Sequence, residues 1–179
     1  MLLGLAIFFS CLAAVFGTIA LHECGHFVAG ISAGIPPDQM KICLATIPQH
    51  VALRDGEAWI APWDHQRYVS RSRALIKDKK GAIAYVSGGL VAQTIVFIAF
   101  VFTSKALGVG GLWLIPLTAA LVAEPLLYLF ADVVFSRLRQ SPCGDFSGLW
   151  QISPWASVLV TSLVVATHLT VLVHIIKGA

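Results

Sequence analysis

The sequence predicts an all-α membrane protein with about four transmembrane helices and a small β-hairpin in the first loop. Of 179 residues, 58% are hydrophobic and 12% are charged, and the mean hydropathy is +0.83. A soluble domain of this size needs polar side chains over its whole surface, whereas lipid accepts apolar side chains that face outward. The composition therefore favours one polytopic domain over residues 1–179 and argues against a large water-facing domain.

Four apolar segments are each near or above the roughly 20 residues that cross hydrocarbon as a helix. They cover residues 2–34, 82–103, 112–135 and 155–176. The first segment has the length and apolarity of an export signal. However, no Lys or Arg precedes it and it continues beyond a plausible cleavage point, so we expect a retained helix.

The formal net charge of +3 has an explanation in membrane topology. Ten of the twelve Lys and Arg residues lie in the loops that follow the first and third apolar segments. The positive-inside rule places these two loops in the cytoplasm and both termini outside. Nucleic acid is therefore not an expected partner, and the lipid bilayer is.

The first loop, residues 36–80, is expected to carry structure on the cytoplasmic side. Short extended stretches flank the turn signal Asp55-Gly56 and predict a β-hairpin. These stretches cover residues 41–46, 49–54 and 57–61. Between residues 63 and 80, apolar side chains alternate with many cations, which predicts an amphipathic helix on the membrane surface. A solvated basic connector is the alternative interpretation.

The chemistry-bearing motif is His22-Glu23-Cys24-Gly25-His26, which has the pattern H-E-x-x-H. On a helix, the i, i+4 spacing places both imidazoles on one face, where they can bind one Zn²⁺. Glu23 could take a proton from a zinc-bound water, whose pKa the metal lowers to about 7. Residues 2–35 contain no other acid, base or histidine, and such groups are costly at bilayer depth. A His/Glu pair that bonds between helices is the alternative.

A hydrolytic zinc site needs a third protein ligand and an open position for water. Asp145 is the first candidate, because it follows a cytoplasmic loop in which Pro142 and Gly144 break helix and can bend the chain back. Asp132, Glu124 and Cys143 remain rivals. Asp132 could instead be solvated at the membrane interface or pair with Arg137 or Arg139, which follow it in the chain.

Several other polar residues have structural explanations. Ser87-Gly88-Gly89 and Ala92 are small and permit close helix packing. Gln93 brings an amide into the second apolar segment, either for an interhelical hydrogen bond or as a donor near the metal site. We expect reduced thiols at Cys11, Cys24, Cys43 and Cys143, packing roles for His168 and His174, and loop positions for His50 and His65.

An H-E-x-G-H motif inside an apolar segment, followed by a hairpin-containing loop, resembles the site-2 protease family of intramembrane zinc metalloproteases. That family has a G-P-x-x-N-like element at the start of its next core helix, to which residues 88–93 are similar in degenerate form. The family's third ligand is an Asp in a Pro-containing segment, and residues 141–146 are similar to that segment. Phe146 here replaces the usual Gly, and Gly144 replaces the usual Leu.

The resemblance implies a zinc-dependent endopeptidase with His22, His26 and Asp145 as metal ligands, Glu23 as the catalytic base and Gln93 in a supporting role. Its expected substrate is a membrane protein, cut in or near a transmembrane helix. The distribution of basic residues places the active site toward the cytoplasm. An edge strand of the hairpin could hold the unwound substrate by strand addition. The competing interpretation is a catalytically inert membrane adaptor or regulatory protein that keeps the motif as a structural metal centre or polar cluster.

Overall fold

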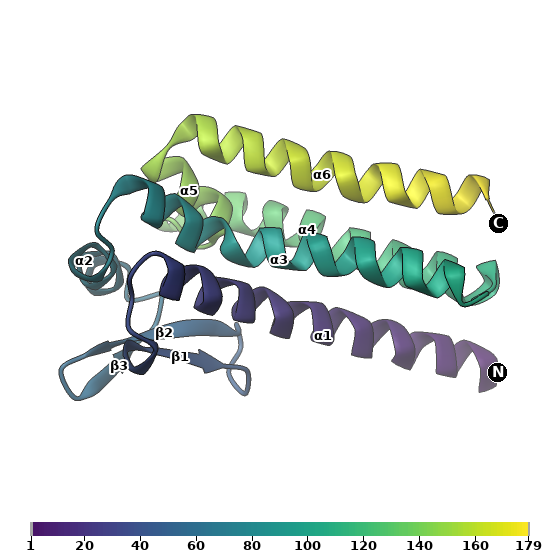
Figure 1. The fold of residues 1–179 in the computed structure, drawn as a ribbon, viewed down its shortest axis with the longest axis horizontal. Coiled ribbons are helices and arrows are strands. Elements are labelled where there is room, and N and C mark those ends of the chain that lie inside the picture. Colours follow the sequence, from purple (N-terminus) through teal and green to yellow (C-terminus); the bar gives the residue numbers. More distant parts are fainter. Residues whose placement is uncertain (1, 179) are drawn as a thin grey trace.

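The structure is a computed structural model that describes residues 2–178. Long helices run side by side, and a small sheet and a short helix cover one end of the bundle (Figure 1). Within the described residues there are six α-helices, one short 3-10 helix and three strands. In chain order these are α1 Leu2–Ser32, η1 Pro37–Gln39, β1 Met40–Cys43, β2 His50–Asp55, β3 Ala58–Ile60, α2 His65–Leu75, α3 Lys79–Ala106, α4 Gly111–Arg139, α5 Asp145–Ile152 and α6 Pro154–Lys177.

Four of the described helices, α1, α3, α4 and α6, are long and apolar enough to cross a membrane. Large apolar side chains on these helices point away from the protein, for example Phe8, Phe130 and Leu163, each more than half exposed. Such surfaces suit lipid and would be costly in water. The predicted helical architecture is confirmed, with helix ends within a few residues of the expected spans, and the length and composition of these four helices suggest a multi-pass membrane protein.

Helices α1 and α3 approach closely through small residues. A Cβ atom on Gly25 of α1 would collide with the backbone of Gly88 and with Ala92 of α3. A Cβ atom on Gly88 would in turn lie 2.5 Å from the Cβ of Ala29. Close backbone contact of this kind replaces the hydrophobic driving force that lipid does not provide. It also brings the His22–His26 face of α1 against α3.

The first loop forms a three-stranded antiparallel sheet, so the predicted hairpin was too small. β2 is the central strand, with Ile42 opposite Val51 on one side and Leu53 opposite Ile60 on the other. The turn signal was correct, since Gly56 lies between β2 and β3 with φ of +64°. All three predicted extended stretches therefore pair as strands of one sheet.

The sheet is attached to the helical bundle by an apolar cluster. Ile35, Met40 and Leu53 are buried in it together with Tyr85 of α3. The amphipathic helix predicted over residues 63–80 is shorter: α2 ends at Leu75, and Asp78 caps the start of α3 by accepting a hydrogen bond from the Gly81 N–H at 2.7 Å. The sheet and α2 lie at the end of the bundle opposite both termini (Figure 1).

Helix α5 was not predicted, because the sequence indicated only a break around Pro142 and Gly144. The break exists: α4 ends at Arg139, the next residue, Gln140, has a left-handed φ of +53°, and the chain turns before α5 begins at Asp145. Eight helical residues then follow before Pro154 starts α6. The break and the short helix together direct residue 145 back toward the bundle.

Candidate metal site

His22 and His26 lie one turn apart on the buried face of α1, as the motif predicted. Their Nε2 atoms are 3.0 Å apart and their rings meet edge to face. Both residues are less than one-tenth exposed. The site lies inside the bundle, about 9 Å or more before the end of α1, given a rise of 1.5 Å per residue from His26 to Ser32.

The other ring nitrogen of each histidine has a fixed acceptor on α3. His22 Nδ1 donates to Gln93 Oε1 at 2.9 Å, and His26 Nδ1 donates to the backbone carbonyl oxygen of Tyr85 at 2.8 Å. Each neutral imidazole therefore carries its proton on Nδ1 and directs the lone pair of Nε2 toward the other. Two lone pairs at 3.0 Å repel unless a cation lies between them.

Asp145, the first amino acid of α5, completes the group from 119 residues away. Its Oδ2 atom lies 2.9 Å from His22 Nε2 and 3.2 Å from His26 Nε2. Two nitrogens and one oxygen therefore converge in a set that could hold a metal ion.

Gly89 leaves the room that such an ion requires. A Cβ atom at this position would lie 2.5 Å from the Nε2 atoms of both His22 and His26. The glycine thus faces the point on which the ligand lone pairs converge, and any side chain would fill it. The donor set and this opening fit a bound metal ion.

Asp132, one of the rival ligands, holds Asp145 in place from α4. Its carboxylate is 3% exposed and accepts hydrogen bonds from the Ser147 N–H at 2.9 Å and from the Ser136 hydroxyl at 2.9 Å. The predicted solvation or pairing with Arg137 or Arg139 was therefore wrong. Ser147 in the first turn of α5 and Ser136 in α4 are its partners in place of the arginines.

Tyr128 lies one turn before Asp132 on α4 and acts on the same segment. Its phenol oxygen accepts a hydrogen bond from the Asp145 N–H at 3.0 Å. A Cβ atom on Gly144 would lie 2.8 Å from this oxygen and from Asp132 Cγ, so α4 and the turn fit only through a glycine. The sequence offered one signal for this contact between α4 and the turn: Asp132 places a carboxylate inside an apolar helix, where it needs polar partners.

Gln93 and Glu124 form the outer layer around His22. Gln93 Oε1 accepts from His22 Nδ1, and Gln93 Nε2 donates to Glu124 Oε2. Both ends of the amide are therefore engaged, and Gln93 orients a ligand instead of offering a free donor to the site. Glu124 lies behind Gln93 and is not among the convergent ligand atoms.

Glu23 lies beside the ligands on α1 and is 6% exposed. The backbone N–H of Val51, in the central strand β2, faces its carboxylate. Glu23, His22, His26 and Asp145 line one cavity of about 1250 Å³, which the sheet and α2 border on its outer side. The carboxylate can therefore reach water and any molecule that enters this cavity.

The other candidate residues lie elsewhere. Cys143 is exposed and contacts the Ser141 carbonyl, and Cys24 is exposed, so neither joins the ligand group within the described residues. His168 is buried and stacks on Phe97, as expected for a packing residue. His50 and His65 lie in the loop between α1 and α3, as expected: His50 opens β2 and packs on Trp63. His65 begins α2.

Comparison of the chain with protein-family models, with curated proteins and with solved structures gives no match.

Proposed function

We propose that the protein is an intramembrane zinc metalloprotease that hydrolyses a peptide bond in or near a transmembrane segment of a membrane-protein substrate. One observation carries the proposal. The ligand atoms of His22, His26 and Asp145 converge beside the free carboxylate of Glu23 in a cavity at membrane depth. The motif's resemblance to the site-2 protease family supports the same proposal.

We propose zinc as the metal because of the H-E-x-x-H motif and the donor types. Zinc–ligand bonds of about 2.0–2.1 Å in a tetrahedron separate the ligand atoms by about 3.3 Å. The three separations here are 2.9, 3.0 and 3.2 Å. Two imidazoles and one carboxylate are also a common catalytic zinc set, and three protein ligands leave a fourth position for water. A structural zinc site is instead closed by four protein ligands.

In the proposed reaction, the metal and the side chains around it have separate roles. A bound zinc ion supplies Lewis acidity, which lowers the pKa of water at the open position. Glu23 accepts the proton of the attacking water and donates it to the nitrogen of the leaving amine. Gln93 and Tyr85 keep the two imidazoles in the tautomer that binds metal.

The central strand offers a place for an extended substrate. On the β3 side, pairing of β2 starts at Leu53, because β3 ends at Ile60 before Pro62. The carbonyl of Val51 accepts from the Tyr68 hydroxyl at 2.8 Å, and its N–H faces Glu23. This edge lines the cavity, and a substrate strand added here would take the place of the Tyr68 hydroxyl as the partner of the Val51 carbonyl, beside the proposed base. In this arrangement the substrate strand pairs with β2 and not with β3.

Substitution of the proposed base tests the reaction. Purified protein with zinc is incubated with a panel of single-span membrane substrates, and cleavage and zinc content are measured together. Glu23→Gln should abolish cleavage while zinc stays bound, because the change removes only the proton acceptor. Full cleavage by this variant refutes the mechanism. Zinc retention without cleavage by the wild-type protein on any substrate favours the inert adaptor.

A further inference from the structure

The cavity above the site is divided by charge. Its inner wall carries the carboxylates of Glu23, Glu124, Asp132 and Asp145, while its outer rim carries the basic side chains of Arg73, Lys77, Lys79 and Arg139. These cations come from three parts of the chain: the end of α2, the connector to α3 with the first residue of α3, and the last residue of α4. We call these four cations the basic rim.

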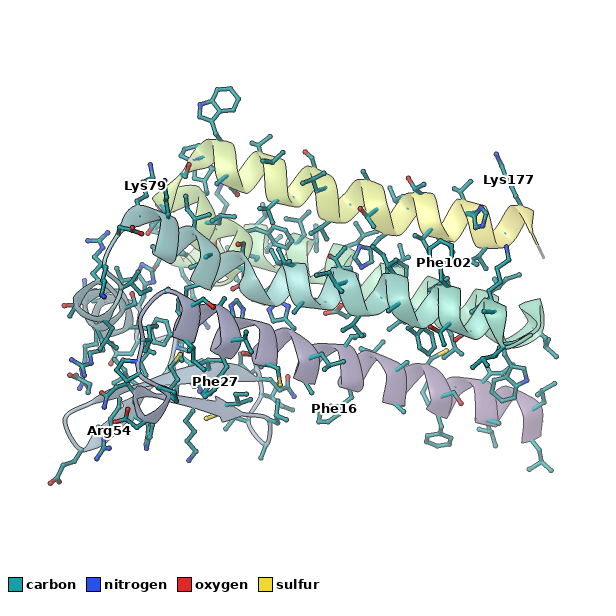
Figure 2. The ribbon with its side chains drawn as sticks, in the orientation of Figure 1. Phe16, Phe27, Arg54, Lys79, Phe102 and Lys177 are labelled. Carbon is teal, nitrogen blue, oxygen red and sulfur yellow. The ribbon has the colours of Figure 1, made fainter. Side chains whose placement is uncertain are left out.

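The basic rim is available to a ligand. All four side chains belong to exposed residues, and among residues 2–178 none of them forms an ion pair. Asp78, the one carboxylate at the rim, caps α3 through the Gly81 N–H. Figure 2 shows Lys79 at the same end of the bundle as Arg54 and at the opposite end from Lys177.

The surrounding cations differ from the basic rim. Arg67 pairs with Asp55 at 2.7 Å, and Arg71 donates to the Arg54 carbonyl and to Gln39. Lys80 and Arg137 are exposed neighbours of rim residues but do not line this cavity. Among the described Lys and Arg residues, the four of the basic rim are therefore the ones that line this cavity, and none of them forms an ion pair.

We propose that the basic rim selects substrates with an acidic segment next to the transmembrane helix. This inference rests on the proposed proteolysis and names its substrate class. A helix that unwinds into the site must leave its flanking segment at the mouth, beside Arg73, Lys77, Lys79 and Arg139. Acidic side chains gain Coulomb energy there, and basic ones lose it.

The expected gain is discrimination against most membrane proteins. Transmembrane helices ordinarily carry Lys and Arg in their cytoplasmic flanks. A positive mouth repels such flanks and admits the minority that are acidic, so repulsion contributes to specificity as much as attraction does. The positive-inside rule alone explains cations at the membrane interface, but it does not require them to surround the entrance to the metal site.

The test measures binding apart from cleavage. The probes are three synthetic single-span peptides with one apolar helix and a flank of four Glu, four Gln or four Lys. Binding to zinc-loaded Glu23→Gln protein is measured in nanodiscs of zwitterionic lipid. We expect affinity to fall in the order Glu, Gln, Lys, and the differences to shrink between 50 and 500 mM salt because screening shortens the range of the interaction, from about 14 Å to about 4 Å.

Matched substitutions assign the effect to the rim. Lys79→Gln and Arg139→Gln should each reduce the preference for the Glu flank over the Gln flank by about two- to fivefold, as for an exposed ion pair. Lys80→Gln and Arg137→Gln remove equal charge one or two residues away, outside this cavity, and should leave the preference unchanged.

Three outcomes overturn the inference: equal affinity for all three flanks, equal effects of rim and control substitutions, or rim substitutions that weaken binding to anionic-lipid vesicles without altering peptide preference. The last outcome would make the rim a lipid-binding surface. If instead the proposed proteolysis is wrong but the preference is right, the wild-type protein binds the Glu-flanked peptide preferentially and leaves it uncut.

Discussion

The carboxylate of Asp132 accepts a hydrogen bond from the backbone N–H of Ser147 at 2.9 Å, which ties α4 to the first turn of α5. Asp145 lies two residues before Ser147 and carries the third ligand atom. Tyr128 holds the Asp145 N–H from the same face of α4. The position of the ligand therefore depends on a carboxylate that does not itself reach the metal site.

The first prediction concerns this carboxylate. Asp132→Ala should lower zinc affinity by about 10- to 100-fold, because it frees the turn that presents Asp145, as other losses of outer-sphere contacts do. Affinity is measured by competition with a chelator. Asp38→Ala, an exposed acid in η1, is the control and should have no effect. If both variants bind zinc like the wild type, Asp132 does not hold the ligand.

Gln93 should control zinc affinity through His22. Gln93→Leu removes the acceptor of His22 Nδ1 and is expected to weaken zinc binding by about 10- to 100-fold. Gln93→Glu restores an acceptor for His22 Nδ1 but places a second carboxylate next to that of Glu124, and the two repel. Combining Gln93→Glu with Glu124→Gln exchanges the acid and the amide and removes this repulsion. The double variant should recover most of the affinity.

A nearby polar residue provides the control for Gln93. Thr94 follows it on α3 and donates only to the Leu90 carbonyl, at 2.7 Å. Thr94→Val should leave zinc affinity unchanged. Equal losses in Thr94→Val and Gln93→Leu would show that α3 is merely destabilised, and no recovery in the exchanged pair would contradict the orienting role.

Gly89→Ala should abolish most zinc binding without unfolding the protein. The added methyl group would lie 2.5 Å from both Nε2 atoms, in the space between the ligands. Gly17→Ala is the matched control, because a Cβ atom on this helical glycine of α1 contacts nothing within 4 Å. Zinc content and thermal unfolding are measured on both variants. Full zinc occupancy in Gly89→Ala would exclude the proposed metal position.

The orientation in the membrane is open to chemical labelling. We expect cysteine in place of Glu57 or Arg139 to react with an impermeant maleimide only after permeabilisation, and cysteine in place of Leu107 to react from outside. Glu57 is chosen over its neighbour Gly56, whose φ of +64° disfavours other residues. The four native cysteines are first replaced by serine. External labelling at position 57 would reverse the topology and the proposed cytoplasmic access.

Local patterns revealed the parts of the site that lie close together in sequence. The i, i+4 spacing identified His22 and His26, and the four long apolar segments identified the helices. Asp145 was identified as the leading candidate from its Pro- and Gly-containing surroundings. The structure brings it to the histidines because α4 and the turn before α5 return the chain across 119 residues.

Other contacts could not be predicted because they depend on tertiary packing. The backbone carbonyl of Tyr85 orients His26, and a carbonyl has no sequence signature. The small size of Gly89 suggested helix packing, but only the folded structure places it opposite the ligands. Asp132 was misinterpreted because its nearest charges in sequence, Arg137 and Arg139, are not its partners in space.

X-ray absorption at the zinc edge of the purified wild-type protein tests the central claim most directly. A catalytic site made by His22, His26 and Asp145 predicts one zinc ion per chain, with nitrogen and oxygen neighbours at about 2.0–2.1 Å and one of them exchangeable water. Asp145→Ala should lose this signal. Absence of zinc, sulfur neighbours at about 2.3 Å from a cysteine, or a site closed by four protein ligands would contradict the account.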